Sequence, residues 1–320
     1  MKNTTKRPRL LSAREMIPAL ASIVVVLAVA CGSSAAPTAL PRPTTAPADP
    51  TAITTIMATT ILEVGEQRIA FLLTTTKGLI KTPTALVTPV FLDSDGSPGQ
   101  TSGPALEAVF NPWPYGIRGS YSTYANFDRP GRWRLNVQVD NPAGVDEVAI
   151  EITVMEKSPV PALGSKALIS ETKTLASHGA IEGITTDYSP DPDLYRLTVK
   201  EAAENPLPSV VVFASPAFCT SPTCGPQVDT VTELKEKHPE VANYIHVEVY
   251  DNPAEIQGDL DRAEIFGVVD DWGLTSIKDY FNESWTFILD AEGRIDDRFE
   301  GFATLDELEI ALLKVLPQAG

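Results

Sequence analysis

Apolar and polar residues alternate most clearly in the middle of the chain. In "GRWRLNVQVD", residues 131–140, apolar side chains fall at every second position, and "EVAIEITV", residues 147–154, repeats the pattern. Because successive side chains of a strand point to opposite faces, each run predicts a strand with one buried face. The intervening Asn141, Pro142 and Gly144 favour a turn, so the two strands are expected to pair as an antiparallel hairpin.

Further strands are predicted upstream of this hairpin, at residues 67–74, 85–92 and 106–110, and bring the expected number to about seven. No helical period of useful length interrupts these strands. A small all-β sandwich is therefore expected over residues 56–157. Its aromatic residues fit either core positions or a binding face, and these residues are Trp113, Tyr115, Tyr121 and Tyr124.

The C-terminal part of the chain alternates strand and helix signals. "PSVVVFAS", residues 208–215, is a continuous apolar run of the kind that a sheet buries on both faces, and a helical pattern follows at 226–238. The strand patterns "NYIHVEVYD" and "SWTFILD" come next, and a capping box of Thr304 and Glu307 opens a last amphipathic helix. The order β-α-β-α-β-β-α predicts an α/β domain over residues 191–320.

Two segments lack hydrophobic periodicity. Residues 31–55 are rich in Pro, Ala and Thr, a composition typical of an extended, flexible tether. Residues 158–190 contain prolines near both ends and Gly164, which break any long regular element. The second segment is therefore expected to link the two folded domains.

The first thirty residues have the pattern of an export signal. A basic segment is followed by "IPALASIVVVLAVA", residues 17–30, which is too short for an ordinary membrane span of about 20 residues. The small residues before Cys31 resemble the lipobox of bacterial lipoproteins, with Ala28 where that family usually has Leu. This resemblance implies a signal peptide over residues 1–30, lipid attachment at Cys31 and an extracytoplasmic protein anchored to the bacterial cell membrane. An ordinary signal-peptidase site at residues 28–30 is the alternative.

The formal net charge of −17 comes from the C-terminal part of the chain. Residues 201–320 contain 24 acidic and 7 basic side chains, a difference that equals the net charge of the whole chain. Binding of nucleic acid or of an anionic membrane surface needs Lys and Arg to neutralise phosphates. This composition therefore argues against either partner for the C-terminal part.

The chain has three cysteines, Cys31, Cys219 and Cys224. Outside the cytoplasm a close pair of thiols is expected to be oxidised, and with Cys31 lipidated the other two can pair only with each other or with another molecule. A zinc or copper site would need histidines near these cysteines, but none of the three histidines in the chain lies within ten residues of them. No cofactor or metal is expected, and the pair is either redox-active or structural.

The C-terminal pattern resembles the thioredoxin fold, and most closely the extracytoplasmic thioredoxin-like lipoproteins of the TlpA and ResA type. The resemblance rests on Cys224-Gly225-Pro226 opening the helix after the first buried strand and on the later hairpin "TFILDAEGRI", and it spans residues 194–316. In the all-β part, "FDRPGRWRLNVQVD" is similar to the penultimate strand of bacterial immunoglobulin-like domains. The expected architecture is therefore an N-terminal immunoglobulin-like sandwich followed by a thioredoxin-like α/β domain.

Three features depart from the thioredoxin pattern. The family motif places a second cysteine three residues after the first, where this chain has Gln227, and the partner cysteine instead lies upstream at Cys219. Ser284 stands where the family has its cis-proline, and Val212 stands where thioredoxin itself has a buried acid. The helix register makes Cys224 the attacking residue, whereas the strand register brings Cys219 near that place.

Two functions follow from these patterns. The first is thiol-disulfide exchange with protein thiols or disulfides of the cell envelope, in which Cys224 attacks and Cys219 resolves the mixed disulfide. The second is a non-enzymatic binding lipoprotein in which the Cys219–Cys224 disulfide only locks a loop.

Overall fold

The structure, a computed structural model, describes residues 52–101, 104–114, 118–141, 144–277 and 283–317. The predicted signal peptide, Cys31, Tyr115 and most of the predicted tether lie outside these residues. The described elements belong to one compact unit, Ala48–Gly320. No helix within the described residues is long and apolar enough to cross a membrane.

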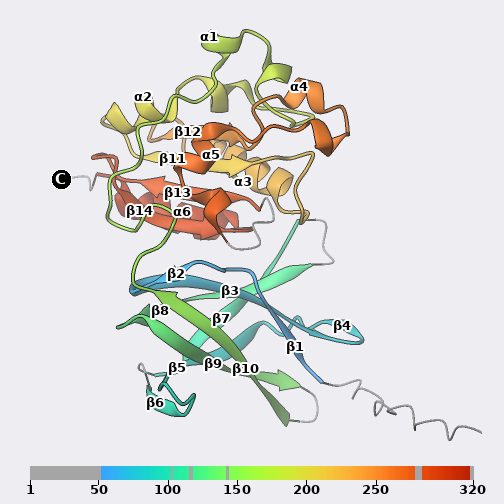
Figure 1. Ribbon diagram of the computed structural model, residues 1–320, viewed down its shortest axis with the longest axis vertical. Helices are drawn as coiled ribbons and strands as arrows, with labels where there is room; N and C mark the ends of the chain where they lie inside the picture. The colour runs from blue at the N-terminus through green and yellow to red at the C-terminus, as the bar shows by residue number, and fades with distance from the viewer. Residues whose placement is uncertain (1–51, 102–103, 115–117, 142–143, 278–282, 318–320) are drawn as a thin grey trace, which may run out of the picture. The chain divides into compact units, whose positions relative to one another are not determined.

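The first part of the described chain contains only β-strands (Figure 1). They form one sheet in the order β1-β3-β8-β7-β5-β9-β10-β2, with β4 beside β3 and β6 beside β5. Neighbouring strands are antiparallel except β2 and β10, which are parallel. The strands are β1 (Thr54–Met57), β2 (Leu62–Glu63), β3 (Gly65–Thr75), β4 (Gly78–Leu79), β5 (Thr84–Leu92), β6 (Pro98–Thr101), β7 (Leu106–Pro112), β8 (Gly119–Phe127), β9 (Gly131–Asn141) and β10 (Gly144–Met155).

The predicted hairpin is confirmed by β9 and β10, which pair Trp133 with Ile152 and Val137 with Val148. The apolar face of β9 is buried, and the Trp133 ring packs edge-on against Phe127. The alternating pattern therefore marks a core face, as the periodicity predicts.

The predicted strand number and layer arrangement need correction. The described residues of the all-β part contain ten strands rather than about seven, because elements such as β2 and β4 are too short to show a period of two. They also form one hydrogen-bonded sheet rather than two separate sheets. The reason is β5, whose residues Thr84–Val87 pair with β7 while Leu86–Phe91 pair with β9.

The second part contains a four-stranded sheet in the order β12-β11-β13-β14. Its strands are β11 (Ser209–Ala214), β12 (Asn243–Glu248), β13 (Trp285–Leu289) and β14 (Ile295–Glu300). β11 and β12 are parallel, β13 is antiparallel to β11, and β14 is antiparallel to β13. This strand order, with the helices described below, is that of a thioredoxin-like fold, as the sequence predicts.

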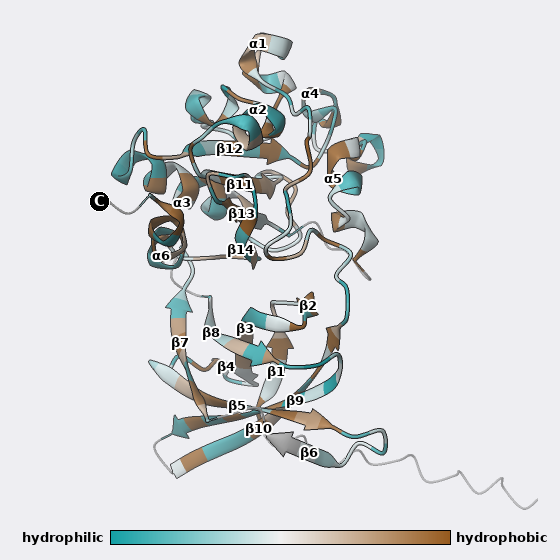
Figure 2. Ribbon diagram, turned by 90° about the vertical axis from the view of Figure 1, so that its left-hand side faces the viewer, coloured by the Kyte–Doolittle hydropathy of each residue, from teal (hydrophilic) through white to brown (hydrophobic). Residues whose placement is uncertain are grey.

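Helices and helical turns cover both faces of this sheet (Figure 2). The α-helices are α1 (Leu175–His178), α2 (Val199–Glu204), α3 (Cys224–Lys237), α4 (Pro253–Ile256), α5 (Gly267–Asp271) and α6 (Leu305–Val315). The 3-10 helices are η1 (Ile181–Gly183), η2 (Pro192–Tyr195), η3 (Leu260–Arg262) and η4 (Leu274–Ser276). The predicted capping box of Thr304 and Glu307 is present at the start of α6.

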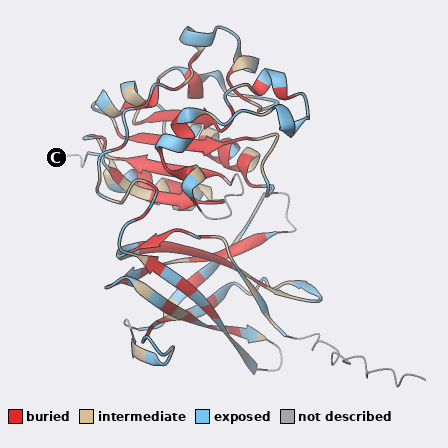
Figure 3. Ribbon diagram, viewed as in Figure 1, coloured by how far each residue is buried: buried red, intermediate tan, exposed pale blue. Residues whose placement is uncertain are grey.

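β11 is buried on both faces, as its continuous apolar run predicts (Figure 3). Val210 and Val212 belong to the core formed with α3 and α6. Val211 and Phe213 belong to the core on the opposite face, which includes Trp272. The strand therefore holds the middle of the sheet rigidly, and the loop that follows it starts from a fixed point.

Residues 158–190, expected to be a linker, pack in part against the α/β sheet. Val160 and Ile184 are buried in its two cores, and Ser170 Oγ accepts a hydrogen bond from Trp272 Nε1 at 2.9 Å. Lys166 and Arg294 form an isolated bridge that ties this segment to the turn before β14. Prolines exclude long helices and strands, but they do not prevent apolar side chains from packing against a neighbouring core.

Polar contacts join the all-β part to the α/β part within this unit. Arg68 of β3 pairs with Glu307 of α6 at 2.8 Å, and Arg298 of β14 pairs with Glu63 at 3.1 Å. The carboxylate of Glu300 accepts hydrogen bonds from the backbone N–H and hydroxyl of Thr60, which lies between β1 and β2.

Candidate active site

The two cysteines of the C-terminal part form a disulfide between the loop after β11 and the start of α3. Their Cα atoms are 5.8 Å apart, within the usual range for a disulfide. The loop reaches this distance by turning back over residues 220–223, where Ser221, Pro222 and Thr223 favour turns. The sulfur atoms therefore lie at the helix N-terminus, where the thioredoxin-like fold places its redox pair.

The two cysteines of the disulfide differ in burial. Cys224 is 0 % exposed and packs into the core beside Val228, whereas Cys219 is only half-buried. An external thiolate can therefore approach Cys219 and not Cys224. The sequence suggested Cys224 as the attacking residue because it opens the helix, but the helix turns that side chain toward the sheet.

The N-terminus of α3 suits a thiolate at Cys224. Thr223, the residue that caps this helix, makes no side-chain hydrogen bond to the N–H groups of the first turn. These N–H groups, together with the dipole of the helix, favour negative charge at its first residue. Cys224 is thus placed to act as a leaving group when the disulfide opens.

Gln227 occupies the place of the second cysteine in the family pattern. Its side chain is fully buried, and its Oε1 accepts a hydrogen bond from the Ala303 N–H at 2.7 Å. Among the described residues, its Nε2 has no hydrogen-bond partner. Because residues three apart are neighbours on a helix, this amide donor lies on the same face as Cys224.

A half-buried carboxyl group that the sequence did not predict lies beside the disulfide loop. Glu283, two residues before β13, accepts hydrogen bonds from Ser221 and, at 3.0 Å, from Thr223 Oγ1. Thr223 Oγ1 lies 3.8 Å from Cys219 Sγ. Burial raises the pKa of Glu283, and the hydrogen bonds from Ser221 and Thr223 oppose this shift in part. The Thr223 hydroxyl therefore connects a proton-carrying group to the accessible sulfur.

Ser284, at the predicted cis-proline position, is fully buried and does not take that role. Its hydroxyl donates to the Gly301 carbonyl at 3.1 Å, and the Gly301 N–H donates to the Ser284 carbonyl at 2.8 Å. The described residues contain no cis peptide bond. At this edge of the site, the neighbouring Glu283 is the residue that contacts the disulfide loop.

Val212 is a core residue, but a buried acid lies on the adjacent strand. Glu248 of β12 is paired with Ala214 of β11, and its carboxylate accepts hydrogen bonds from the N–H and hydroxyl of Thr186, both at 2.7 Å. Thr186 Oγ1 in turn accepts from the Ala217 N–H at 3.3 Å. Burial raises the pKa of Glu248. Glu248 thus positions the first residues of the disulfide loop rather than contacting a sulfur atom.

His246 of β12 is buried and neutral. Its Nε2 donates to the Ala214 carbonyl at 3.0 Å, and its Nδ1 accepts from the Tyr195 hydroxyl at 2.6 Å. Burial lowers the pKa of His246 to about 4. The described residues hold no group of three or more His, Cys, Asp or Glu side chains suited to a metal ion.

This histidine makes folding stability depend on pH. Between pH 6.5 and about 4 the unfolded chain binds a proton that the native His246 does not, so stability is lost as the pH falls through this window. Between pH 7 and pH 4 we expect the free energy of unfolding of wild type to fall by about 3 kcal/mol more than that of His246→Asn, as measured by urea unfolding. Equal pH dependence of the stability of wild type and of His246→Asn would contradict the buried, neutral His246.

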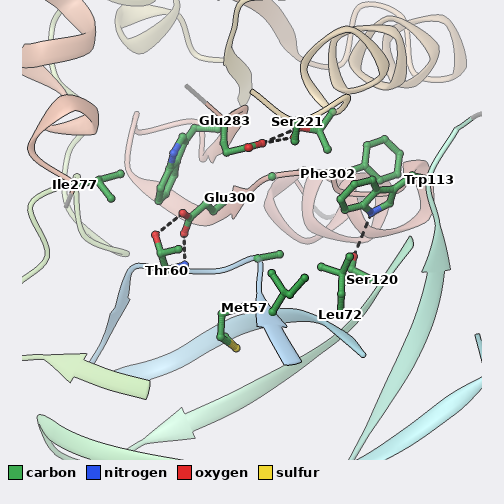
Figure 4. A pocket seen from close by; sticks show the side chains of 15 residues that line it. Met57, Thr60, Leu72, Trp113, Ser120, Ser221, Ile277, Glu283, Glu300 and Phe302 are labelled. Atoms are coloured by element: carbon green, nitrogen blue, oxygen red, sulfur yellow. Dashed lines mark hydrogen bonds between the residues drawn. The ribbon is translucent and has the colours of Figure 1, made fainter. Parts of the chain in front are cut away.

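A cavity of about 450 Å³ adjoins the disulfide loop (Figure 4). Ser221, Thr223 and Glu283 form the wall on the disulfide side, and Glu300 with its partner Thr60 forms another polar patch. Most other lining side chains are apolar and come from both parts of the unit. These apolar residues are Ile56, Met57, Ala58, Leu72, Trp113, Ile277, Trp285 and Phe302.

Three of the four aromatic residues singled out in the all-β part are described, and their environments differ. Trp113 lines the cavity and its Nε1 donates to Ser120 Oγ at 3.3 Å, whereas Tyr121 is a fully buried core residue. The hydroxyl of Tyr124 donates to Asp297 at 2.8 Å. Of the two alternatives left by the sequence, a lining position thus applies to Trp113 and a core position to Tyr121.

No model of a protein family and no curated protein matches the chain. Among solved structures, the chain is similar to the crystal structure of a thioredoxin-family thiol:disulfide interchange protein from Chlorobium tepidum TLS, with 10% sequence identity and a TM-score of 0.30. The match covers 48% of this chain and 100% of the other. A TM-score and a sequence identity this low support no conclusion about this protein. The thioredoxin-like fold is instead evident from the order and directions of the strands in the sheet itself.

Proposed function

We propose that this protein catalyses thiol-disulfide exchange through Cys219 and Cys224. The observation that carries the proposal is the combination of a half-buried Cys219 with a disulfide partner at the N-terminus of α3. A disulfide that only locks a loop needs neither an accessible sulfur nor a helix N-terminus. Exchange needs both, since one sulfur must be reached and the other must leave as a thiolate.

Oxidation of a client dithiol proceeds in two displacements. A client thiolate attacks Cys219 Sγ, the Cys219–Cys224 bond breaks, and its electron pair leaves on Cys224 as a thiolate. The second client thiolate then attacks the client sulfur of the mixed disulfide, and Cys219 leaves as a thiolate. The client gains a disulfide and loses two electrons, and the protein gains a dithiol.

The two protons released by the client are taken up at the site. Glu283 passes one through the Thr223 hydroxyl to the Cys219 thiolate and regains a proton from solvent. Gln227 Nε2 and the N–H groups of α3 stabilise Cys224 until it is protonated. Reduction of a client disulfide uses the same steps in reverse, with the Glu283 carboxylate accepting the proton of Cys219.

We place this activity outside the cytoplasm, on a protein anchored to the membrane through lipid at Cys31. The export pattern of residues 1–30 and the tether of residues 31–55 support this location. The clients are then thiols or disulfides of cell-envelope proteins, and nucleic acid is not a partner.

We further propose that residues 56–157 form an immunoglobulin-like domain, and that residues 191–320 form the thioredoxin-like domain. The strand order β1-β3-β8-β7 in one half of the sheet and β5-β9-β10-β2 in the other, antiparallel at every pair except β10 and β2, supports the first assignment. Residues 158–190 connect the two domains.

Turnover of a small substrate tests the exchange function. The full-length oxidised protein is mixed with glutathione and a fluorogenic peptide disulfide, and initial rates are compared with those of the Cys219→Ser, Cys224→Ser double variant. We expect many turnovers per protein molecule and only the uncatalysed rate with the double variant. Equal rates for both would assign the disulfide a purely structural role.

Glu283→Gln tests the proposed proton transfer. In oxidation of a reporter dithiol the carboxyl form is the donor, so its contribution is present below the raised pKa of Glu283 and fades as the pH rises through it. We expect the wild type to be faster than Glu283→Gln by on the order of 10²-fold at low pH, with the ratio declining toward one at high pH. Glu233→Gln, an exposed acid on α3, should match wild type throughout, and a pH-independent ratio for Glu283→Gln would contradict the assignment.

A further inference from the structure

We propose that the cavity beside the disulfide loop binds the apolar side chains that flank the reactive cysteine of a client polypeptide. This inference rests on the proposed exchange function and names the class of client that the site selects. It also assigns a role to the all-β part of the chain, which supplies part of the cavity wall.

The cavity adjoins the loop that holds the reactive sulfur, although no cysteine is among the described residues that line it. Ser221 and Thr223 line it, and Thr223 Oγ1 lies 3.8 Å from Cys219 Sγ. Figure 4 shows Ser221 and Glu283 at one end of the cavity, with Met57 and Leu72 across from them. A client joined to Cys219 therefore has its neighbouring side chains within reach of this space.

The size and chemistry of the cavity fit apolar side chains. Its volume of about 450 Å³ lies within the range of about 300–1,000 Å³ typical of small binding sites. Among the described residues that line it there is no Lys, Arg or His, and its two carboxyl groups belong to Glu283 and Glu300. An acidic side chain of a client would therefore find no cationic partner in the cavity and would be repelled by these carboxylates. Transfer of an apolar side chain from water to the apolar wall would instead be favourable.

The wall from the all-β part is not fully covered in the chain itself. Ile56 of β1 is 50 % exposed, and Met57, Leu72 and Trp113 are half-buried. When apolar side chains that line a cavity are still in contact with water, an apolar occupant removes their surface from water, and this burial stabilises the complex. Since these residues come from β1, β3 and the end of β7, a thioredoxin-like domain alone would lack this half of the wall.

Two reporter peptides test the inference with the full-length protein, in the presence of glutathione, which reduces the Cys219–Cys224 disulfide after each turnover. Each carries one cysteine in a disulfide with a fluorogenic thiol, flanked on both sides by Phe in one peptide and by Ser in the other. We expect kcat/KM for the Phe peptide to exceed that for the Ser peptide at least tenfold, and this preference to fall toward one in Leu72→Asp and in Ile56→Asp. Leu86→Asp is the matched control, because Leu86 is 45 % exposed on β5 and does not line the cavity.

The outcomes separate the cavity from the exchange chemistry. Equal rates for both peptides in wild type, or a full preference in both cavity variants, would overturn the client-binding cavity and leave the exchange function standing. Turnover of neither peptide by wild type would overturn the exchange function itself. Two cavity variants on different strands are used so that misfolding of one, detected by circular dichroism, does not decide the result.

Discussion

Cys224→Ser is expected to accumulate mixed disulfides through Cys219, whereas Cys219→Ser is expected to accumulate none. Removal of Cys224 leaves the accessible sulfur without its partner, so a thiol compound bound there cannot be displaced internally. Removal of Cys219 leaves only a sulfur that is 0 % exposed in the core beside α3. The difference should be nearly all-or-none after brief incubation with oxidised glutathione.

Mass spectrometry of proteolytic peptides gives the readout and its control. The peptide that contains residues 219 and 224 is separated from any peptide that contains Cys31, so glutathione on each cysteine is counted independently. Rapid formation of a glutathione adduct at Cys224 in Cys219→Ser would contradict the inference that only Cys219 is accessible to external thiol compounds. Cys224 would then be the attacking residue.

Arg68→Met is expected to destabilise the protein by about 3–5 kcal/mol. The guanidinium of Arg68 on β3 is 2 % exposed, pairs with Glu307 of α6 at 2.8 Å and donates to the Phe302 carbonyl at 3.2 Å. The substitution leaves the carboxylate of Glu307, whose side chain is 16 % exposed, without its cation, and an uncompensated charge that is largely removed from water is costly. Urea unfolding measures the loss, which shows how strongly the two parts of the unit support each other.

Two further variants separate this effect from a general effect of losing an arginine. Arg132→Met removes an exposed ion pair with Glu151 and should cost no more than about 1 kcal/mol. The double variant Arg68→Met, Glu307→Leu removes both charges and should recover part of the lost stability. Equal losses of stability in Arg68→Met and Arg132→Met would mean that the Arg68–Glu307 pair contributes no more to stability than the exposed Arg132–Glu151 pair.

Local sequence patterns predicted those strands and helix ends that are determined by residues close together in the sequence. The period of two in residues 131–154 predicted β9 and β10, and the continuous apolar run predicted β11. Thr304 and Glu307 predicted the start of α6 because a capping box involves only neighbouring residues. Each of these signals depends on backbone geometry within one or two elements.

Residues brought together by packing were not predictable in the same way. Glu283 and the disulfide loop are sixty or more positions apart, and Trp113 comes from the other part of the unit, so no local spacing links them. The strand pattern of β12 likewise does not reveal the contact between His246 and Tyr195. Glu283 had one usable signal, its place directly before the predicted strand that faces the disulfide in the thioredoxin pattern.

A redox titration shows directly whether the Cys219–Cys224 disulfide exchanges with external thiols. The full-length protein is equilibrated in buffers of reduced and oxidised glutathione, thiols are trapped with an alkylating agent, and the fraction of the Cys219–Cys224 disulfide is counted by mass. We expect a reduction potential above about −300 mV, where the bond opens and closes with the glutathione pool. A bond that stays closed in all buffers, with a potential far below about −300 mV, would contradict exchange and make the disulfide structural.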